Sequence, residues 1–158
     1  MRPMSEKNGI GHLRSVDHET EWPVARLVRE LCTAGVPVMA PFRVLILEDD
    51  AILALDLETI VCCWTDAEVT ACRSIAQARK ALTGGFDLAL LDIDVVDGKS
   101  YEFAESLRSS KLPFAFVSGA MQDDCPETLR DVAFIPKPYT QRAIESIVAS
   151  AAGGRRHP

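Results

Sequence analysis

The sequence has few histidines and no cysteine pattern of the kind that builds a metal site or a disulfide framework. No histidine lies between His18 and His157, which excludes histidine chemistry from the central part of the chain. The five cysteines are odd in number and none are spaced as CxxC, so we expect neither a zinc site nor paired disulfides. No signal-peptide pattern is present, and a cytoplasmic location is expected.

The sequence also lacks a long apolar run and a basic stretch. Arg26, Arg29 and Glu30 interrupt the most apolar N-terminal segment, so we expect no membrane-spanning helix. Residues 1–41 hold five basic and five acidic residues, so the net charge of −6 arises entirely from the residues that follow. An acidic domain without a basic stripe argues against direct nucleic-acid binding.

Four short apolar runs stand out, each followed at once by polar residues. They are 44–47 before Glu48, Asp49 and Asp50, 88–91 before Asp92, 114–117 before Ser118, and 133–136 before Lys137 and Pro138. Such runs are typical of buried parallel strands, and in an open α/β sheet ligands bind at the carboxyl ends of the strands. A carboxylate cluster, a hydroxyl and an ammonium at one edge predict a site for a divalent metal and a phosphoryl group.

The remaining pattern alternates strands with helices. Strands are predicted at 44–47, 66–71, 86–91, 112–117 and 132–135, and helices at 51–64, 74–82, 99–107 and from Thr140 to about residue 151. The stretch 122–130 contains Pro126 and three acids and predicts only a short or irregular helix. On the helix at 51–64, the apolar face is expected to run from Ile52 through Leu57 to Trp64.

This alternation predicts an α/β fold, a flavodoxin-like doubly wound parallel sheet of five strands. The expected strand order is 2-1-3-4-5, with a cleft between strands one and three.

Glu48-Asp49, Asp92, Ser118 and Lys137-Pro138, in this order, resemble the signature of the CheY-like receiver domain of bacterial two-component response regulators. The resemblance covers residues 42–150. It implies that Asp92 accepts a phosphoryl group from a histidine kinase or a phosphotransfer protein, with Mg²⁺ as cofactor. It also implies that Asp49 and Asp92 ligate the metal directly, Glu48 mostly through water, and Asp94 through its backbone carbonyl.

The same resemblance assigns the other roles. Lys137 would pair with Asp92 at rest and with a phosphoryl oxygen afterwards, and the Lys137–Pro138 bond would be cis. Ser118 would donate its hydroxyl to another phosphoryl oxygen, and Phe134 would occupy the aromatic switch position. The domain would catalyse its own phosphorylation and slow dephosphorylation. No helix-turn-helix, ATPase or cyclase segment follows, so we expect a single-domain receiver that signals to a downstream protein target by contact.

Two other interpretations of these residues remain open. Residues 92–96 fit the DxDxV opening of haloacid-dehalogenase-like phosphatases, with Ser118 and Lys137 as later motifs. That family, however, places the motif on its first strand and needs an acidic pair after the lysine, where only Glu145 follows. The second alternative is a receiver-like interaction module that works without phosphorylation.

Residues 1–41 lie outside the resemblance and form a predicted N-terminal extension. Pro23 suits the start of a helix at about 22–33 that Gly35 would end, with an apolar stripe of Val24, Leu27, Val28 and Leu31. We expect this helix to pack on the receiver or to mediate a homodimer. Met39 lies directly before the first strand, so a start of translation there is the alternative. Residues 151–158 are expected to form a short tail.

Overall fold

A five-stranded parallel sheet organises the residues that the structure describes. The computed structural model describes residues 40–154, so the predicted helix at 22–33 lies outside the described part of the chain. The strands are β1 (Phe42–Leu47), β2 (Ala67–Cys72), β3 (Leu88–Leu91), β6 (Phe114–Ser118) and β7 (Ala133–Pro136). Their order, β2-β1-β3-β6-β7, confirms the predicted order 2-1-3-4-5.

Strand register places the polar residues that follow β1 and β3 next to each other. Leu47 of β1 pairs with Leu91 of β3, and the backbone amide of Asp92 donates to the carbonyl of Leu47 at 2.8 Å. All four residues of β3 are buried, as expected for a central strand covered on both faces. The polar residues that follow these two strands therefore meet at one edge of the sheet.

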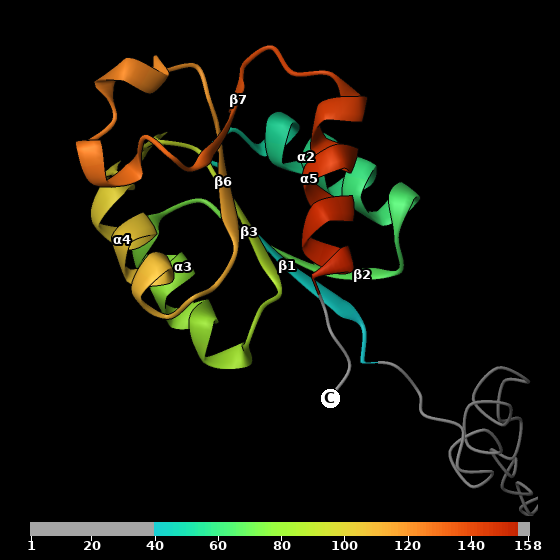
Figure 1. Ribbon diagram of the computed structural model, residues 1–158. Helices are drawn as coiled ribbons and strands as arrows, with labels where there is room; N and C mark the ends of the chain where they lie inside the picture. The colour runs from blue at the N-terminus through green and yellow to red at the C-terminus, as the bar shows by residue number, and fades with distance from the viewer. Residues whose placement is uncertain (1–39, 155–158) are drawn as a thin grey trace, which may run out of the picture. The chain divides into compact units, whose positions relative to one another are not determined.

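Helices cover both faces of this sheet, in two pairs (Figure 1). On one face, α2 (Ala51–Trp64) and α5 (Gln141–Gly153) contribute Leu57, Val61, Ile144 and Val148 to one apolar cluster. On the other face, α3 (Ile75–Ala81) and α4 (Tyr101–Ser109) pack with Phe116 in a second cluster. This is the doubly wound arrangement that the sequence predicts. None of the helices within residues 40–154 is long and apolar enough to cross a membrane.

Helix α2 has the predicted bounds, but part of its predicted apolar face is wrong. Ile52 is 79% exposed and Trp64 is 42% exposed, whereas the buried residues are Ala54, Leu57, Ile60 and Val61. At 3.6 residues per turn, Ile52 lies roughly 140° around the helix from Leu57, so the two cannot share a face. The helix is therefore apolar on its inner face and also carries exposed apolar residues on its outer face.

The segment between β3 and α4 also differs from the prediction. The helix expected at 99–107 begins at Tyr101 instead, because β4 (Asp94–Val95) and β5 (Gly98–Lys99) form a small antiparallel hairpin before it. Gly98 has a φ of +126°, a conformation that other residues rarely adopt. Strands of two residues are too short to produce an alternating sequence pattern.

The stretch 122–130 is irregular, as predicted. It contains two single 3₁₀ turns, η2 (Gln122–Asp124) and η3 (Glu127–Leu129), in place of an α-helix. Cys125 and Leu129 are buried against α4 and hold this segment on the domain.

Candidate functional site

Three carboxylates converge where β1 and β3 end. Glu48 and Asp49 follow β1 and Asp92 follows β3, and one carboxylate oxygen from each lies within 4.8 Å of the other two. Glu48 is 2% exposed and Asp92 is 8% exposed, so most of this negative charge is removed from water. Three hard oxygen donors at this spacing fit a divalent cation such as Mg²⁺.

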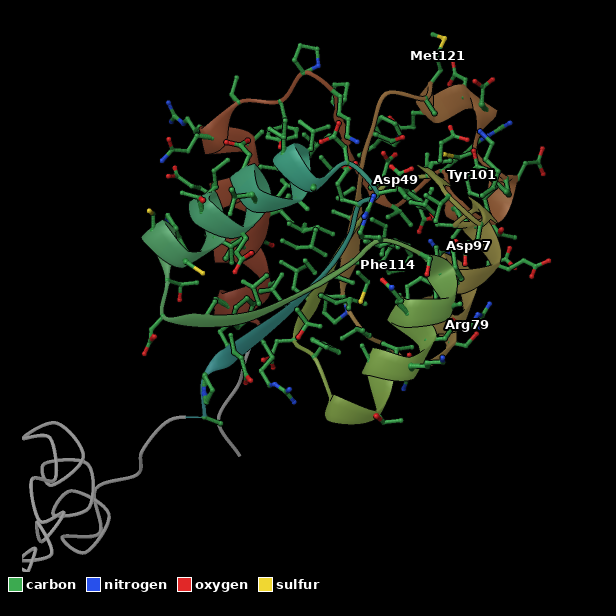
Figure 2. The ribbon with its side chains drawn as sticks, turned by 180° about the vertical axis from the view of Figure 1, so that it is seen from behind. Asp49, Arg79, Asp97, Tyr101, Phe114 and Met121 are labelled. Carbon is green, nitrogen blue, oxygen red and sulfur yellow. The ribbon has the colours of Figure 1, made fainter. Side chains whose placement is uncertain are left out.

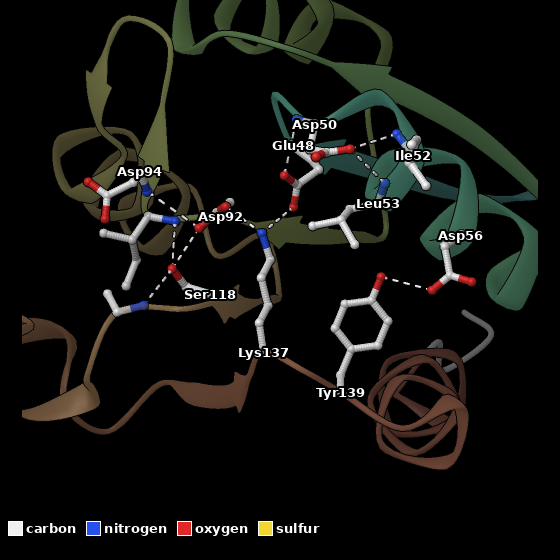
Figure 3. Close-up of polar contacts among 12 residues, drawn as sticks. Glu48, Asp50, Ile52, Leu53, Asp56, Asp92, Asp94, Ser118, Lys137 and Tyr139 are labelled. Atoms are coloured by element: carbon white, nitrogen blue, oxygen red, sulfur yellow. Dashed lines mark hydrogen bonds and ion pairs between the residues drawn. The ribbon is translucent and has the colours of Figure 1, made fainter.

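Lys137 provides the cation that offsets part of this charge. It follows β7, and its ammonium lies between Asp92 Oδ2 at 2.5 Å and Glu48 Oε2 at 2.6 Å (Figure 3). The contact with Asp92 was predicted, whereas the contact with Glu48 was not. The Lys137–Pro138 peptide bond is cis, as predicted. Formally, three carboxylates and one ammonium leave two negative charges, which is the charge that one divalent cation neutralises.

The pKa values of Glu48 and Lys137 reflect this environment. Burial raises the pKa of Glu48, and the hydrogen bond from Lys137 opposes the rise only in part. Burial alone would lower the pKa of Lys137, but the hydrogen bonds to Asp92 and Glu48 outweigh burial and raise it. The stability that the Lys137 charge contributes is therefore present at neutral pH and is lost only in alkaline solution, as pH rises through the raised pKa.

Ser118 completes the surroundings of Asp92. Its hydroxyl donates to Asp92 Oδ1 at 2.6 Å and accepts from the backbone amide of Ala120 at 3.3 Å. The amide of Asp94 also lies 3.4 Å from Asp92 Oδ1. Each oxygen of Asp92 thus has at least one donor: Lys137 on Oδ2, and Ser118 with the Asp94 amide on Oδ1. Lys137, Ser118 and the Asp94 amide thus all donate to the carboxylate of Asp92.

Two predicted site residues lie further out. The side chain of Asp94 is exposed and pairs with Lys99 at 2.6 Å, so only its backbone is near Asp92. Phe134 is half-buried in β7, and its ring centroid lies 6.3 Å from that of Phe116. The structure brings Glu48, Asp49, Asp92, Ser118 and Lys137 together and leaves the Asp94 carboxylate and the Phe134 ring outside the polar cluster.

One contact to the loop after β1 was not predicted from the sequence. Arg73, which follows β2, donates from Nε to the backbone carbonyl of Asp49 at 3.3 Å. An arginine in a loop carries no signal of its own in the sequence. Only its neighbouring serine, a typical helix-capping residue, marks the place as a helix start.

No family model and no curated protein matches the sequence, but solved structures do. The receiver domain of HemR from Leptospira biflexa is 26% identical, with a TM-score of 0.62 over 75% of this chain and 99% of that chain. SdrG from Sphingomonas melonis Fr1 is 29% identical, with a TM-score of 0.61 over 73% and 99%. A CheY-like response regulator receiver domain from Methylobacillus flagellatus is 20% identical, with a TM-score of 0.63 over 71% and 99%. The described residues therefore have the fold of CheY-like receiver domains.

The fold also bears on the phosphatase alternative. The DxDxV motif begins after β3, the third strand of the sheet in chain order. The acidic pair Glu48-Asp49 follows β1 and therefore precedes the motif in the chain. The phosphatase pattern requires the motif on the first strand, so the described residues do not meet it.

Replacing Asp49 tests the metal site. In the wild type, Mg²⁺ should raise the melting temperature because it binds the folded cluster in preference to the unfolded chain. Asp49→Asn should lose that Mg²⁺-dependent rise, and its metal-free melting temperature should be equal or higher, because one of three clustered carboxylates is gone. The measurement is thermal unfolding by circular dichroism with and without Mg²⁺.

Asp50→Asn is the matched control. The carboxylate of Asp50 caps α2 by accepting from the amides of Ile52 and Leu53, and asparagine caps helices equally well. This variant should keep the full Mg²⁺ response. A full response in Asp49→Asn would rule out ligation by that carboxylate.

Proposed function

We propose that this receiver domain accepts a phosphoryl group on Asp92 from the phosphohistidine of a histidine kinase or a phosphotransfer protein. The modified domain then signals by changing its affinity for a protein target. The observation that supports this most is the position of Asp92, which lies between an acidic pair on one side and Lys137 and Ser118 on the other.

In the proposed reaction, a carboxylate oxygen of Asp92 attacks the phosphorus atom. A P–O bond forms while the P–N bond to the donor imidazole breaks, and the electron pair stays on that nitrogen. Asp49, Asp92 and the Asp94 carbonyl would hold a bound Mg²⁺, with Glu48 acting mostly through water, and the cation would supply positive charge that offsets the developing negative charge. Lys137 would then donate to a phosphoryl oxygen.

Ser118 and Phe134 are the residues that we propose transmit the change. The Ser118 hydroxyl now donates to Asp92, and a phosphoryl oxygen would be a stronger acceptor for it. Because Ser118 Oγ also accepts from the Ala120 amide, a shift of this hydroxyl moves the start of the segment 119–131. Phe134 pairs with Phe116 across β6 and β7. It lies at the start of β7, where the segment 119–131 leads back into the sheet.

Labelling with acetyl phosphate and Mg²⁺ tests the acceptor. The wild type should gain one phosphoryl group by intact mass, and Asp92→Asn should gain none, because no other carboxylate in the described residues has both Lys137 and Ser118 as donors. Asp66→Asn, which alters an exposed carboxylate before β2, should label normally. Label that persists and maps to Asp94 or Ser118 would show that the acceptor is misassigned, and an unlabelled wild type would favour the non-phosphorylated interaction module.

Replacing Ser118 tests the switch. Ser118→Ala should still accept phosphate on Asp92 but should lose most of the difference between the free and beryllofluoride-bound NMR spectra at Phe134 and Tyr139. The reason is that the hydroxyl is the group proposed to follow the phosphoryl oxygen. An undiminished spectral difference would mean that the signal leaves the site by another route.

The outer face of α2 supports a protein phosphodonor. Ile52 is 79% exposed and Leu55 is 63% exposed, and both lie on the first two turns of α2, which starts two residues after Asp49. Beside them is a cavity of about 460 Å³ lined by Leu53, Asp56, Lys137, Pro138 and Tyr139. Exposed apolar side chains next to a polar site are typical of protein interaction surfaces. A partner helix on this face would bring its histidine to Asp92.

Ile52→Lys tests this face. Transfer from a phosphorylated phosphotransfer protein that labels the wild type should slow by about tenfold or more, because a charge would replace an apolar contact near the centre of the interface. Labelling by acetyl phosphate should stay within about twofold of wild type. Thr59→Lys, further along the exposed side of α2, should slow protein transfer less. Equal slowing with both donors would place the effect on the site itself rather than on partner binding.

A further inference from the structure

The first turn of α3 and Arg73, which lies just before this helix, contact the two loops that carry the proposed metal ligands. The carboxylate of Asp97, at the tip of the β4–β5 hairpin, accepts from the backbone amides of Ile75 at 2.8 Å and Ala76 at 3.0 Å. Two residues before Ile75, Arg73 donates to the carbonyl of Asp49 at 3.3 Å. Figure 2 shows Asp97 beside the end of α3 that lies nearest to Asp49.

The hairpin needs an external anchor. It has two residues in each strand, and a hairpin of that size is marginal in water by itself. The hairpin has an internal ion pair between Asp94 and Lys99, but both side chains are exposed, so the pair contributes little to the stability of the hairpin. The buried Val95 side chain and the hydrogen bond from the Ser100 amide to the Ile93 carbonyl attach the hairpin to the domain at one end only. The tip is fixed by Asp97.

Helix α3 depends less on this contact than the hairpin does. Ser74 caps the helix by accepting from the Gln77 amide at 3.2 Å, and Gln77 in turn accepts from the Arg73 amide at 2.9 Å. Without Asp97, the amides of Ile75 and Ala76 would lie near the surface, where water can bond to them. The two backbone hydrogen bonds lower the pKa of Asp97, which shows that they favour the ionised carboxylate.

We propose that Asp97 is a positioning residue for the metal site: through the first turn of α3 and the adjoining Arg73, it holds the hairpin that carries the Asp94 carbonyl at a fixed spacing from the loop that carries Asp49. The cation would gain affinity because the carbonyl is already in place before binding. The proposal rests on the proposed function only in its choice of metal ligands. Asp97 touches neither the metal nor the phosphoryl group.

The test compares Asp97→Ala with Ser74→Ala. Each variant removes a side-chain oxygen that accepts hydrogen bonds from backbone amides at the start of α3. Only Asp97→Ala also releases the hairpin. The dissociation constant for Mg²⁺ is measured from amide chemical shifts, with no phosphodonor present. We expect an increase of about tenfold for Asp97→Ala, a smaller increase for Asp97→Asn, which keeps one acceptor oxygen, and a change within about twofold for Ser74→Ala.

An Mg²⁺ affinity in Asp97→Ala within twofold of wild type would overturn the proposal. An equal loss in Ser74→Ala would also overturn it, because the effect would then come from α3 itself. Should Asp97→Ala fail to fold, Asp97→Asn decides, and an unchanged affinity there counts against the proposal.

A second measurement separates this proposal from the proposed function. The Mg²⁺ dependence of acetyl phosphate labelling should shift in Asp97→Ala by the same factor as the dissociation constant. A wild type that binds Mg²⁺ but takes no label would refute the proposed function and leave the positioning role to be decided by the titration. A wild type that shows no Mg²⁺ response would refute both.

Discussion

The site depends on one interaction, the contact of the Lys137 ammonium with two buried carboxylates. Glu48 and Asp92 come from adjacent strands and would repel each other if the cation were absent. Removing one partner from a buried group of charges leaves the others uncompensated, which is far more costly than breaking an exposed ion pair. The residues at the ends of β1, β3 and β7 are therefore coupled, and none of the three can be treated as an independent feature.

This coupling follows from the sheet. Parallel strands in register end at the same edge, and the pairing of Leu47 with Leu91 brings the carboxylates together before any side-chain interaction forms. The pairing of Ser118 with Pro136 does the same for the hydroxyl and the lysine. The buried apolar strands thus supply the free energy of folding that holds like charges near one another. Asp92 is consequently placed by backbone pairing rather than by a flexible loop.

The sequence predicts this part of the molecule well, because the signal is local. Each apolar run leads directly into its polar residue, so strand order and site edge could both be derived from short segments. Contacts between residues that are distant in the sequence could not be predicted in this way. The Glu48–Lys137 pair spans 89 positions, and Asp97 meets Ile75 across 22 positions, with no periodicity to indicate either. The burial of Ile52 was predicted wrongly because its neighbour Leu53 shares its apolar character, and composition alone does not show which side of a helix faces the sheet.

The site therefore combines two kinds of support. Asp92 and Ser118 lie at the ends of the buried strands β3 and β6, so loosening either of them requires disturbing the core. Lys137 follows the edge strand β7, which is held by its pairing with β6. The Asp94 carbonyl lies on a hairpin whose tip is held by exposed hydrogen bonds, which open at a lower free-energy cost than a packed core. Under the two proposals, changes in the hairpin or in the first turn of α3 would alter the surroundings of the site without moving Asp92. Under the proposed function, the Asp94 carbonyl is therefore the one metal ligand whose position can change while Asp49 and Asp92 stay fixed at the ends of β1 and β3.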